Sequence, residues 1–119
     1  MDSSRHPAAR AFVHSVYFWL RPELTAGQRA EFERGLRSLR SIENVRHGWI
    51  GVPAATDRPI IDRSYSYALT LAFDDAAAQE AYQAHPVHDR FRERFGEGYW
   101  EKIVIYDALE APEAGTTTD

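Results

Sequence analysis

The sequence predicts an α+β fold in which four antiparallel strands carry helices on one face, in the order β-α-β-β-α-β. Aromatic and β-branched segments with strand-like alternation are separated by two amphipathic segments with helical spacing. The chain has 119 residues, which is enough for one domain and too few for two. With 44% hydrophobic and 13% aromatic residues it can bury a core, so an intrinsically disordered chain is excluded.

The first strand is predicted at residues 12–20, a β-branched and aromatic run that ends before Pro22. Side chains alternate between the two faces of a strand. One row therefore contains Phe12, His14, Val16, Phe18 and Leu20, and the other contains Val13, Ser15, Tyr17 and Trp19. Because both rows include large apolar groups, we expect both faces of this strand to be covered.

The first helix is predicted to begin after Thr25, which has the spacing of a capping box with Gln28. Phe32, Leu36 and Leu39 follow at i, i+4 and i+7, while charged residues occupy mostly the opposite side. This amphipathic helix is expected to lie on the sheet. An internal glycine at position 35 lowers helix propensity by roughly 1 kcal/mol relative to alanine. It indicates a close packing contact or space left for a ligand.

The remaining strands differ in the strength of their signals. Residues 45–51 predict a weaker strand that contains two glycines and is followed by a loop. Residues 65–73 alternate clearly between bulky and small side chains, which predicts a strand with two different faces. Residues 100–107 predict the closing strand, on which Ile103 and Ile105 share one face.

A proline divides the second helical region. Asp74 and Asp75 favour a helix start, because carboxylates accept hydrogen bonds from the free amide groups of the first turn. The helix is expected to continue to Ala84. Pro86 cannot donate an amide hydrogen and biases the residue before it away from helical dihedral angles, so the helix ends there. Residues 88–95 predict a short second helical segment.

This order of elements is the ferredoxin-like, split βαβ arrangement. We expect a flexible arm at residues 1–10, a single domain at residues 11–109 and a flexible tail at residues 110–119. The sheet of such a fold leaves one face open, and here that face would expose Val13, Tyr17 and Trp19. This is a large apolar area for a lone monomer. The sequence therefore predicts a homodimer that pairs through the open sheet faces.

Composition narrows the classes of partner. The formal charge is −4 and basic residues form no run, which argues against nucleic acid and anionic membranes. The absence of cysteine excludes disulfides, thiolate nucleophiles and cysteine-based metal centres. No apolar run approaches the roughly 20 residues of a membrane helix. We expect a cytoplasmic protein that binds a small molecule, with no cofactor and no bound metal.

The segment Tyr82-x-x-His85-Pro86-x-His88 is the candidate reaction centre. A neutral imidazole titrates near working pH, so His88 can act as a general base, and Tyr82 can hydrogen-bond the base or an enolate oxygen. The structural alternative is that His88 caps the short helix or bonds a backbone carbonyl and so holds the turn after the proline. His85 can pin the turn before Pro86 instead of contacting a ligand. His14, on an apolar strand face, is either a core residue with a satisfied hydrogen bond or part of a pocket.

A metal site is a competing interpretation. His85 and His88 have a plausible ligand spacing, and His14 could supply a third nitrogen. Pro86 disrupts the helical geometry, however, and no carboxylate is placed to complete the set, so no metal is predicted.

The sequence resembles the stress-responsive dimeric α/β barrel family over about residues 12–109. The resemblance rests on the order and spacing of several short segments. These are His14, Trp19-Leu20 before Pro-Glu-Leu-Thr, Gly51, Tyr82-x-x-His85-Pro86-x-His88, and Trp100-Glu101-Lys102 with Asp107. The family implies a ferredoxin-like monomer that dimerises through its sheet into a barrel.

Some plant members of that family are polyketide cyclases, and their catalytic pair matches Tyr82 and His88, with His14 lining the pocket. This sequence has Leu36 where those cyclases have a tyrosine and Tyr67 where they have a histidine, so their substrate is not carried over. The prediction is an apolar pocket for a small carbonyl-rich, polyketide-like molecule, with cyclisation or a related lyase or isomerase step. The residues predicted to line it are His14, Val16, Phe18, Leu36, Tyr67, Leu69 and His85. The alternative is a non-catalytic, stress-responsive binding or structural dimer whose histidines are structural.

Overall fold

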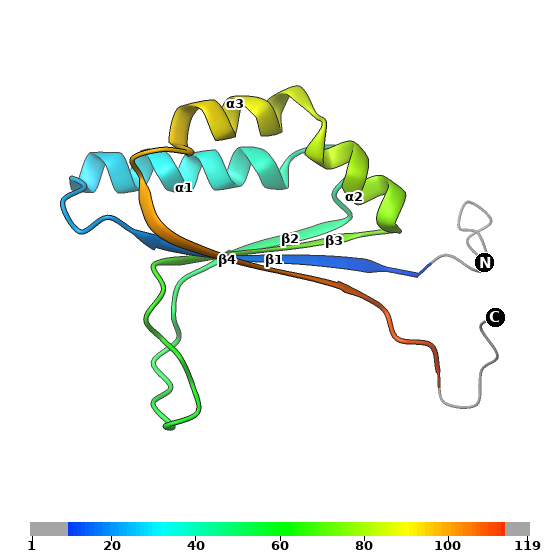
Figure 1. Ribbon diagram of the computed structural model, residues 1–119, viewed down its shortest axis with the longest axis horizontal. Coiled ribbons are helices and arrows are strands. Elements are labelled where there is room, and N and C mark those ends of the chain that lie inside the picture. Colours follow the sequence, from blue (N-terminus) through cyan, green and yellow to red (C-terminus); the bar gives the residue numbers. More distant parts are fainter. Residues whose placement is uncertain (1–9, 114–119) are drawn as a thin grey trace.

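A computed structural model describes residues 10–113 and has the predicted ferredoxin-like fold. Its four strands form one antiparallel sheet in the order β2-β3-β1-β4, with the helices on one face (Figure 1). The arm predicted at residues 1–10 and the tail predicted at residues 110–119 lie largely outside the described residues. The elements are β1 (Phe12–Leu20), α1 (Ala26–Arg40), β2 (His47–Gly51), β3 (Tyr67–Phe73), α2 (Ala76–Gln83), α3 (Pro86–Phe95) and β4 (Trp100–Leu109).

The capping box predicted for the first helix is confirmed. The Thr25 hydroxyl accepts a hydrogen bond from the Gln28 amide at 3.1 Å, and the Gln28 side chain accepts one from the Thr25 amide at 2.8 Å. These bonds satisfy two amide groups that a helix leaves free at its start. The apolar stripe of α1 is buried as its spacing predicted, at Phe32, Leu36 and Leu39.

The side chains of β1 divide between the two faces as predicted. His14, Val16, Phe18 and Leu20 are buried beneath the helices. Their row continues across the sheet, since β1 pairs with β3 and β4 in antiparallel register. The core is therefore the space between this face of the sheet and α1 and α3.

Gly35 on α1 lies directly against two aromatic rings of α3. A Cβ atom at this position would lie 2.5 Å from Cε2 of Phe95 and 3.1 Å from Cε2 of Phe91. These distances support the close packing contact, one of the two explanations that the sequence offered for this glycine.

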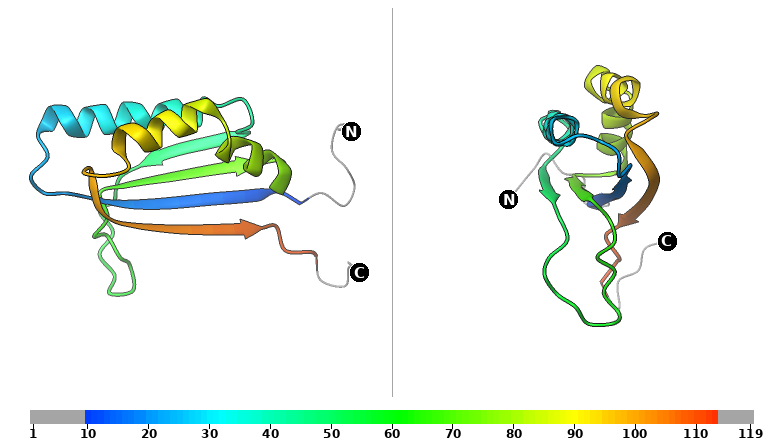
Figure 2. Two further views of the ribbon diagram at one scale, coloured as in Figure 1. Left: turned by 45° about the horizontal axis from the view of Figure 1, so that its top comes forward. Right: turned by 90° about the vertical axis from the view of Figure 1, so that its left-hand side faces the viewer.

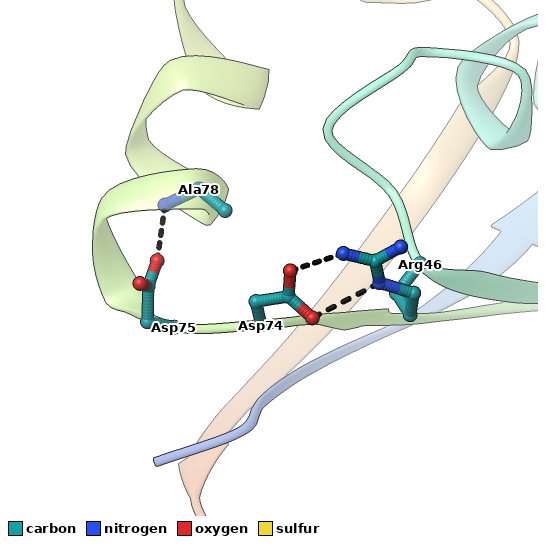
Figure 3. Close-up of polar contacts among 4 residues, drawn as sticks. All are labelled: Arg46, Asp74, Asp75 and Ala78. Carbon is teal, nitrogen blue, oxygen red and sulfur yellow. Dashed lines mark hydrogen bonds and ion pairs between the residues drawn. The ribbon is translucent and has the colours of Figure 1, made fainter. Parts of the chain in front are cut away.

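The second helical region forms two separate helices, α2 and α3. Asp75 caps α2 by accepting a hydrogen bond from the Ala78 amide at 2.8 Å, and Arg46 binds the neighbouring Asp74, which ties the start of β2 to the end of β3 (Figure 3). The predicted break at the proline is confirmed, but α3 begins at Pro86, two residues before the predicted start. Proline suits this first position because the amide it lacks would have no helical partner.

His85 is the N-cap of α3. Its backbone is extended, with φ −72° and ψ 141°, and its Nδ1 accepts a hydrogen bond from the Val87 amide at 3.0 Å. We expect His85→Ala to lower the free energy of unfolding by about 0.5–2 kcal/mol, the range measured for lost caps. Urea denaturation measures this change in the free energy of unfolding, with His47→Ala, at an exposed histidine, as the matched control. Equal stability of the two variants would contradict the capping role.

The face of the sheet opposite the helices carries a group of aromatic side chains. The rings of Tyr17 and Tyr65 lie 5.1 Å apart and those of Tyr17 and Tyr106 lie 6.3 Å apart. Tyr106 is 65% exposed and Trp49 on β2 is 58% exposed. Within one chain this face is therefore open, so the covering that the apolar rows of β1 predict has to come from a second chain. The connection between β2 and β3 extends on this same side of the sheet (Figures 1 and 2).

Among residues 10–113, no helix is long and apolar enough to cross a membrane.

Candidate functional site

A cavity of about 230 Å³ lies between the helix-facing side of the sheet and helices α2 and α3. Its wall on the sheet side is mainly apolar, and its polar groups come from β1, α2 and α3. Six of the residues singled out in the sequence line it together, namely His14, Val16, Phe18, Leu69, Tyr82 and His88. The other lining residues are Leu39, Gln83, Phe91, Arg92, Trp100, Ile103 and Ile105.

Tyr82 lies at the centre of the polar part of the cavity. It projects from α2, and its ring centroid is 5.9 Å from that of His14 and 5.0 Å from that of His88. The side chain is buried, and this burial raises the pKa of its hydroxyl. A phenol with a raised pKa keeps its proton, so Tyr82 is a hydrogen-bond donor at neutral pH.

The helix break explains how Tyr82 and His88 meet. Along an unbroken helix, six residues correspond to about 600° of rotation, which places two side chains on largely opposite faces. Pro86 and the extended His85 redirect the chain between α2 and α3, and the two rings then lie edge to face at 75°.

His88 is the third residue of α3 and differs from the other two histidines of this region. Its Nδ1 is buried and, among buried side-chain nitrogen and oxygen atoms of the described residues, is the one without a hydrogen-bond partner. Burial lowers the pKa of His88, and the positive charge of Arg92 lowers it further. The imidazole is therefore neutral at pH 7, as a general base must be. The cap that the structural alternative assigned to His88 is supplied by His85.

His14 is paired with a carboxylate from the edge strand. Its Nδ1 donates a hydrogen bond to Oδ1 of Asp107 at 2.6 Å, and the two residues lie directly opposite each other in the pairing of β1 with β4. An ionised carboxylate only accepts, so the proton of this hydrogen bond is carried by His14 Nδ1. His14 is thus a buried histidine with a satisfied hydrogen bond and also part of the cavity wall.

Three residues that the sequence placed in the pocket lie elsewhere. Leu36 is fully buried in the core beneath α1. The Tyr67 hydroxyl donates to Oε1 of Glu33 at 2.9 Å, and burial, together with this bond, raises the Tyr67 pKa. His85 caps α3 through its Nδ1, and its Nε2 lies 3.2 Å from Oε1 of Glu43. None of the three lines the cavity.

The sequence did not single out Asp107, Gln83 or Arg92 as site residues. Asp107 could have been found from strand alternation, since it continues the row of Ile103 and Ile105 that faces the helices. Arg92 lies four residues after His88, the spacing at which helix side chains are neighbours. Gln83 had no such signal.

No group of three or more histidine, cysteine, aspartate or glutamate side chains in the described part of the chain is arranged to hold a metal ion. His85 and His88, the candidate ligands in the sequence, make different contacts: one caps α3, and the other lies against Tyr82.

Several solved structures share this fold. A Dabb family protein with a ferredoxin-like fold from Mesorhizobium loti is 24% identical, with a TM-score of 0.71, over 87% of this chain and 99% of that one. The hydroxynitrile lyase from Passiflora edulis is 18% identical, with a TM-score of 0.72, over 88% of this chain and 97% of that one. A dimeric ferredoxin-like protein of unknown function from Thermobifida fusca is 18% identical, with a TM-score of 0.69, over 86% and 92%.

At these identities the similarity establishes the fold alone. No curated protein matches the sequence. The sequence model of the Stress Responsive A/B Barrel Domain, Dabb, matches residues 12–109, which includes every strand and helix described above. The chain therefore belongs to the Dabb, or Stress Responsive A/B Barrel Domain, family.

Proposed function

We propose that this protein binds a small carbonyl-rich molecule in the cavity and catalyses its cyclisation, or a related lyase or isomerase step, by acid–base chemistry. The observation that carries the proposal is the contrast among three histidines. His14 has a carboxylate partner and His85 caps a helix, whereas Nδ1 of His88 is buried without a partner. An unsatisfied buried polar atom costs about 1–3 kcal/mol, and a catalytic role is one of the reasons why a protein retains one.

The chemistry follows from the protonation states. Neutral His88 removes a proton from a carbon that lies between two carbonyl groups, and the electron pair of the C–H bond becomes an enolate. Tyr82, which keeps its proton because burial raises its pKa, donates a hydrogen bond to the enolate oxygen. The enolate carbon then attacks a second carbonyl of the same molecule and closes a ring. The proton held by His88 is returned to the resulting alkoxide.

A lyase step uses the same groups. His88 takes the proton of a hydroxyl group, the neighbouring carbon–carbon bond breaks, and the carbanion that leaves takes the proton. The fold shared with the Passiflora edulis hydroxynitrile lyase makes this a second reaction worth testing.

Incubation with synthetic poly-β-ketones and with cyanohydrins tests the proposal. Wild type is expected to convert members of one class faster than His88→Ala, with products identified by mass spectrometry. Equal rates for the two folded proteins with every substrate would refute the catalytic proposal.

A non-catalytic dimer that binds or protects is the alternative. The cavity of about 230 Å³ is smaller than the range of about 300–1,000 Å³ that is common for ligand sites. A large substrate would not fit into it, and this favours the non-catalytic alternative. It predicts that His88→Ala lowers thermal stability and leaves any activity unchanged. A cytoplasmic location stays a prediction from the sequence.

We also infer that the protein is a homodimer that pairs through its open sheet face. The exposed Trp49 and Tyr106 support this, and the Thermobifida fusca protein of the same fold is described as dimeric. We expect a dimer at micromolar concentration in sedimentation velocity, and dissociation by Tyr106→Glu, because the new carboxylate would be buried without a partner.

Ala81→Glu, which introduces the same charge at an exposed site on α2, is the matched control and should remain dimeric. A monomeric wild type would refute the dimer.

A further inference from the structure

Arg92 is the one described residue in the cavity lining that carries a permanent charge. Its side chain is exposed and also lines the cavity, so it lies at the mouth. On α3 it follows His88 by four residues, and side chains at this spacing share a helix face. The positive charge is close enough to His88 to lower its pKa.

The charge of Arg92 is not neutralised within the described chain. Three other arginines bind carboxylates: Arg37 binds Glu33, Arg46 binds Asp74 and Arg94 binds Glu31. No described carboxylate forms an ion pair with Arg92. A guanidinium that faces an apolar cavity without a counter-ion is suited to a planar anion, because its N–H groups match the two oxygens of a carboxylate.

We propose that Arg92 binds a carboxylate group of the ligand, and that the substrate is therefore an amphiphilic carbonyl compound with a carboxylate at one end. This inference rests on the proposed function and names its substrate class. The carboxylate lies at the mouth, and the carbonyl-bearing part extends inward to His88 and Tyr82. Gln83, at the end of α2, places an amide donor on the same cavity.

The apolar part of the cavity lining that comes from β4 is consistent with this orientation. Ile103 and Ile105 lie on β4 at the edge of the sheet and line the cavity, yet they remain 38% and 51% exposed. With Trp100 they give the same cavity an apolar lining on the β4 side. A ligand with an apolar body would cover these side chains while its anionic end stays at Arg92. The formal charge of the whole chain is −4, so attraction of an anion has to be local.

Calorimetric titration with two matched probes tests the proposal. The probes are 2,4-dihydroxybenzoate and its methyl ester, which differ in charge while sharing the same ring. Wild type is expected to bind the acid more tightly than the ester. Arg92→Gln should weaken binding of the acid by about 10- to 100-fold, which is the affinity that a hydrogen bond to a charged group contributes. It should leave binding of the ester unchanged. Arg92→Lys should bind the acid with an affinity between those of wild type and Arg92→Gln.

Arg90→Gln is the matched control, because Arg90 is on the same helix and lines a different groove, between α1 and α3. It should bind the acid as wild type does. His88→Ala should also keep the preference for the acid. Equal affinity of wild type for acid and ester, or equal losses in Arg90→Gln and Arg92→Gln, would overturn the role of Arg92 and leave the proposed function intact. If wild type bound neither the acid nor the ester, both the role of Arg92 and the proposed function would be overturned.

Discussion

We expect His88→Ala to reduce kcat by about 100- to 10,000-fold, the usual contribution of a general base. KM should change little, because the apolar side chains of Val16, Phe18 and Leu69 that line the cavity remain in place. The loss should appear in kcat since His88 acts on the proton that moves in the transition state, and a group that acts only there contributes little to substrate binding. Steady-state kinetics on the best substrate found among poly-β-ketones and cyanohydrins measures both parameters.

His47→Ala is the control for this variant. His47 is an exposed histidine on β2 that does not line the cavity, so its replacement should leave kcat unchanged. If His88→Ala raised KM and left kcat alone, His88 would be a binding residue and the acid–base mechanism would be wrong.

Phe32→Ala is expected to lower the free energy of unfolding by about 3–5 kcal/mol, as large-to-small changes at buried aromatic residues do. Phe32 is fully buried on α1, and its ring contacts those of Phe18, Phe91 and Trp100. These three residues also line the cavity. The substitution therefore removes the support behind the site as well as the centre of the core. Urea denaturation monitored by tryptophan fluorescence measures the change.

Ile60→Ala provides the comparison, because Ile60 is 84% exposed in the connection between β2 and β3. Its effect should stay within about 0.5 kcal/mol. A loss below about 1 kcal/mol for Phe32→Ala would contradict the position of Phe32 at the centre of the core.

Local signals were enough to predict much of the fold. The alternation in β1 assigned His14, Val16 and Phe18 to one face, and the proline at position 86 located the break between α2 and α3. These features depend on residues close in sequence, where side-chain periodicity and proline geometry act directly. The start of α3 was placed two residues late because Pro86 was interpreted only as a helix terminator, although proline is also favoured at the first helical position.

The cavity was harder to predict because its walls come from distant parts of the chain. The His14–Asp107 pair joins residues 93 positions apart, and it depends on the register between β1 and β4. Placement of Leu36 and Tyr67 in the pocket rested on the family resemblance. In this chain, Leu36 is buried in the core and Tyr67 binds Glu33, since α1 packs over that part of the sheet.

The most direct test of the acid–base account is the titration of His88 by NMR, compared with the pH dependence of kcat/KM. Burial favours the neutral imidazole, so His88 should titrate below its ordinary value of about 6.5. A base must be neutral to accept a proton, so activity should be full above this pKa and fall as the pH drops through it, with the same midpoint as the NMR titration. A His88 pKa at or above about 6.5, or an acid limb of kcat/KM that does not follow His88, would contradict the account.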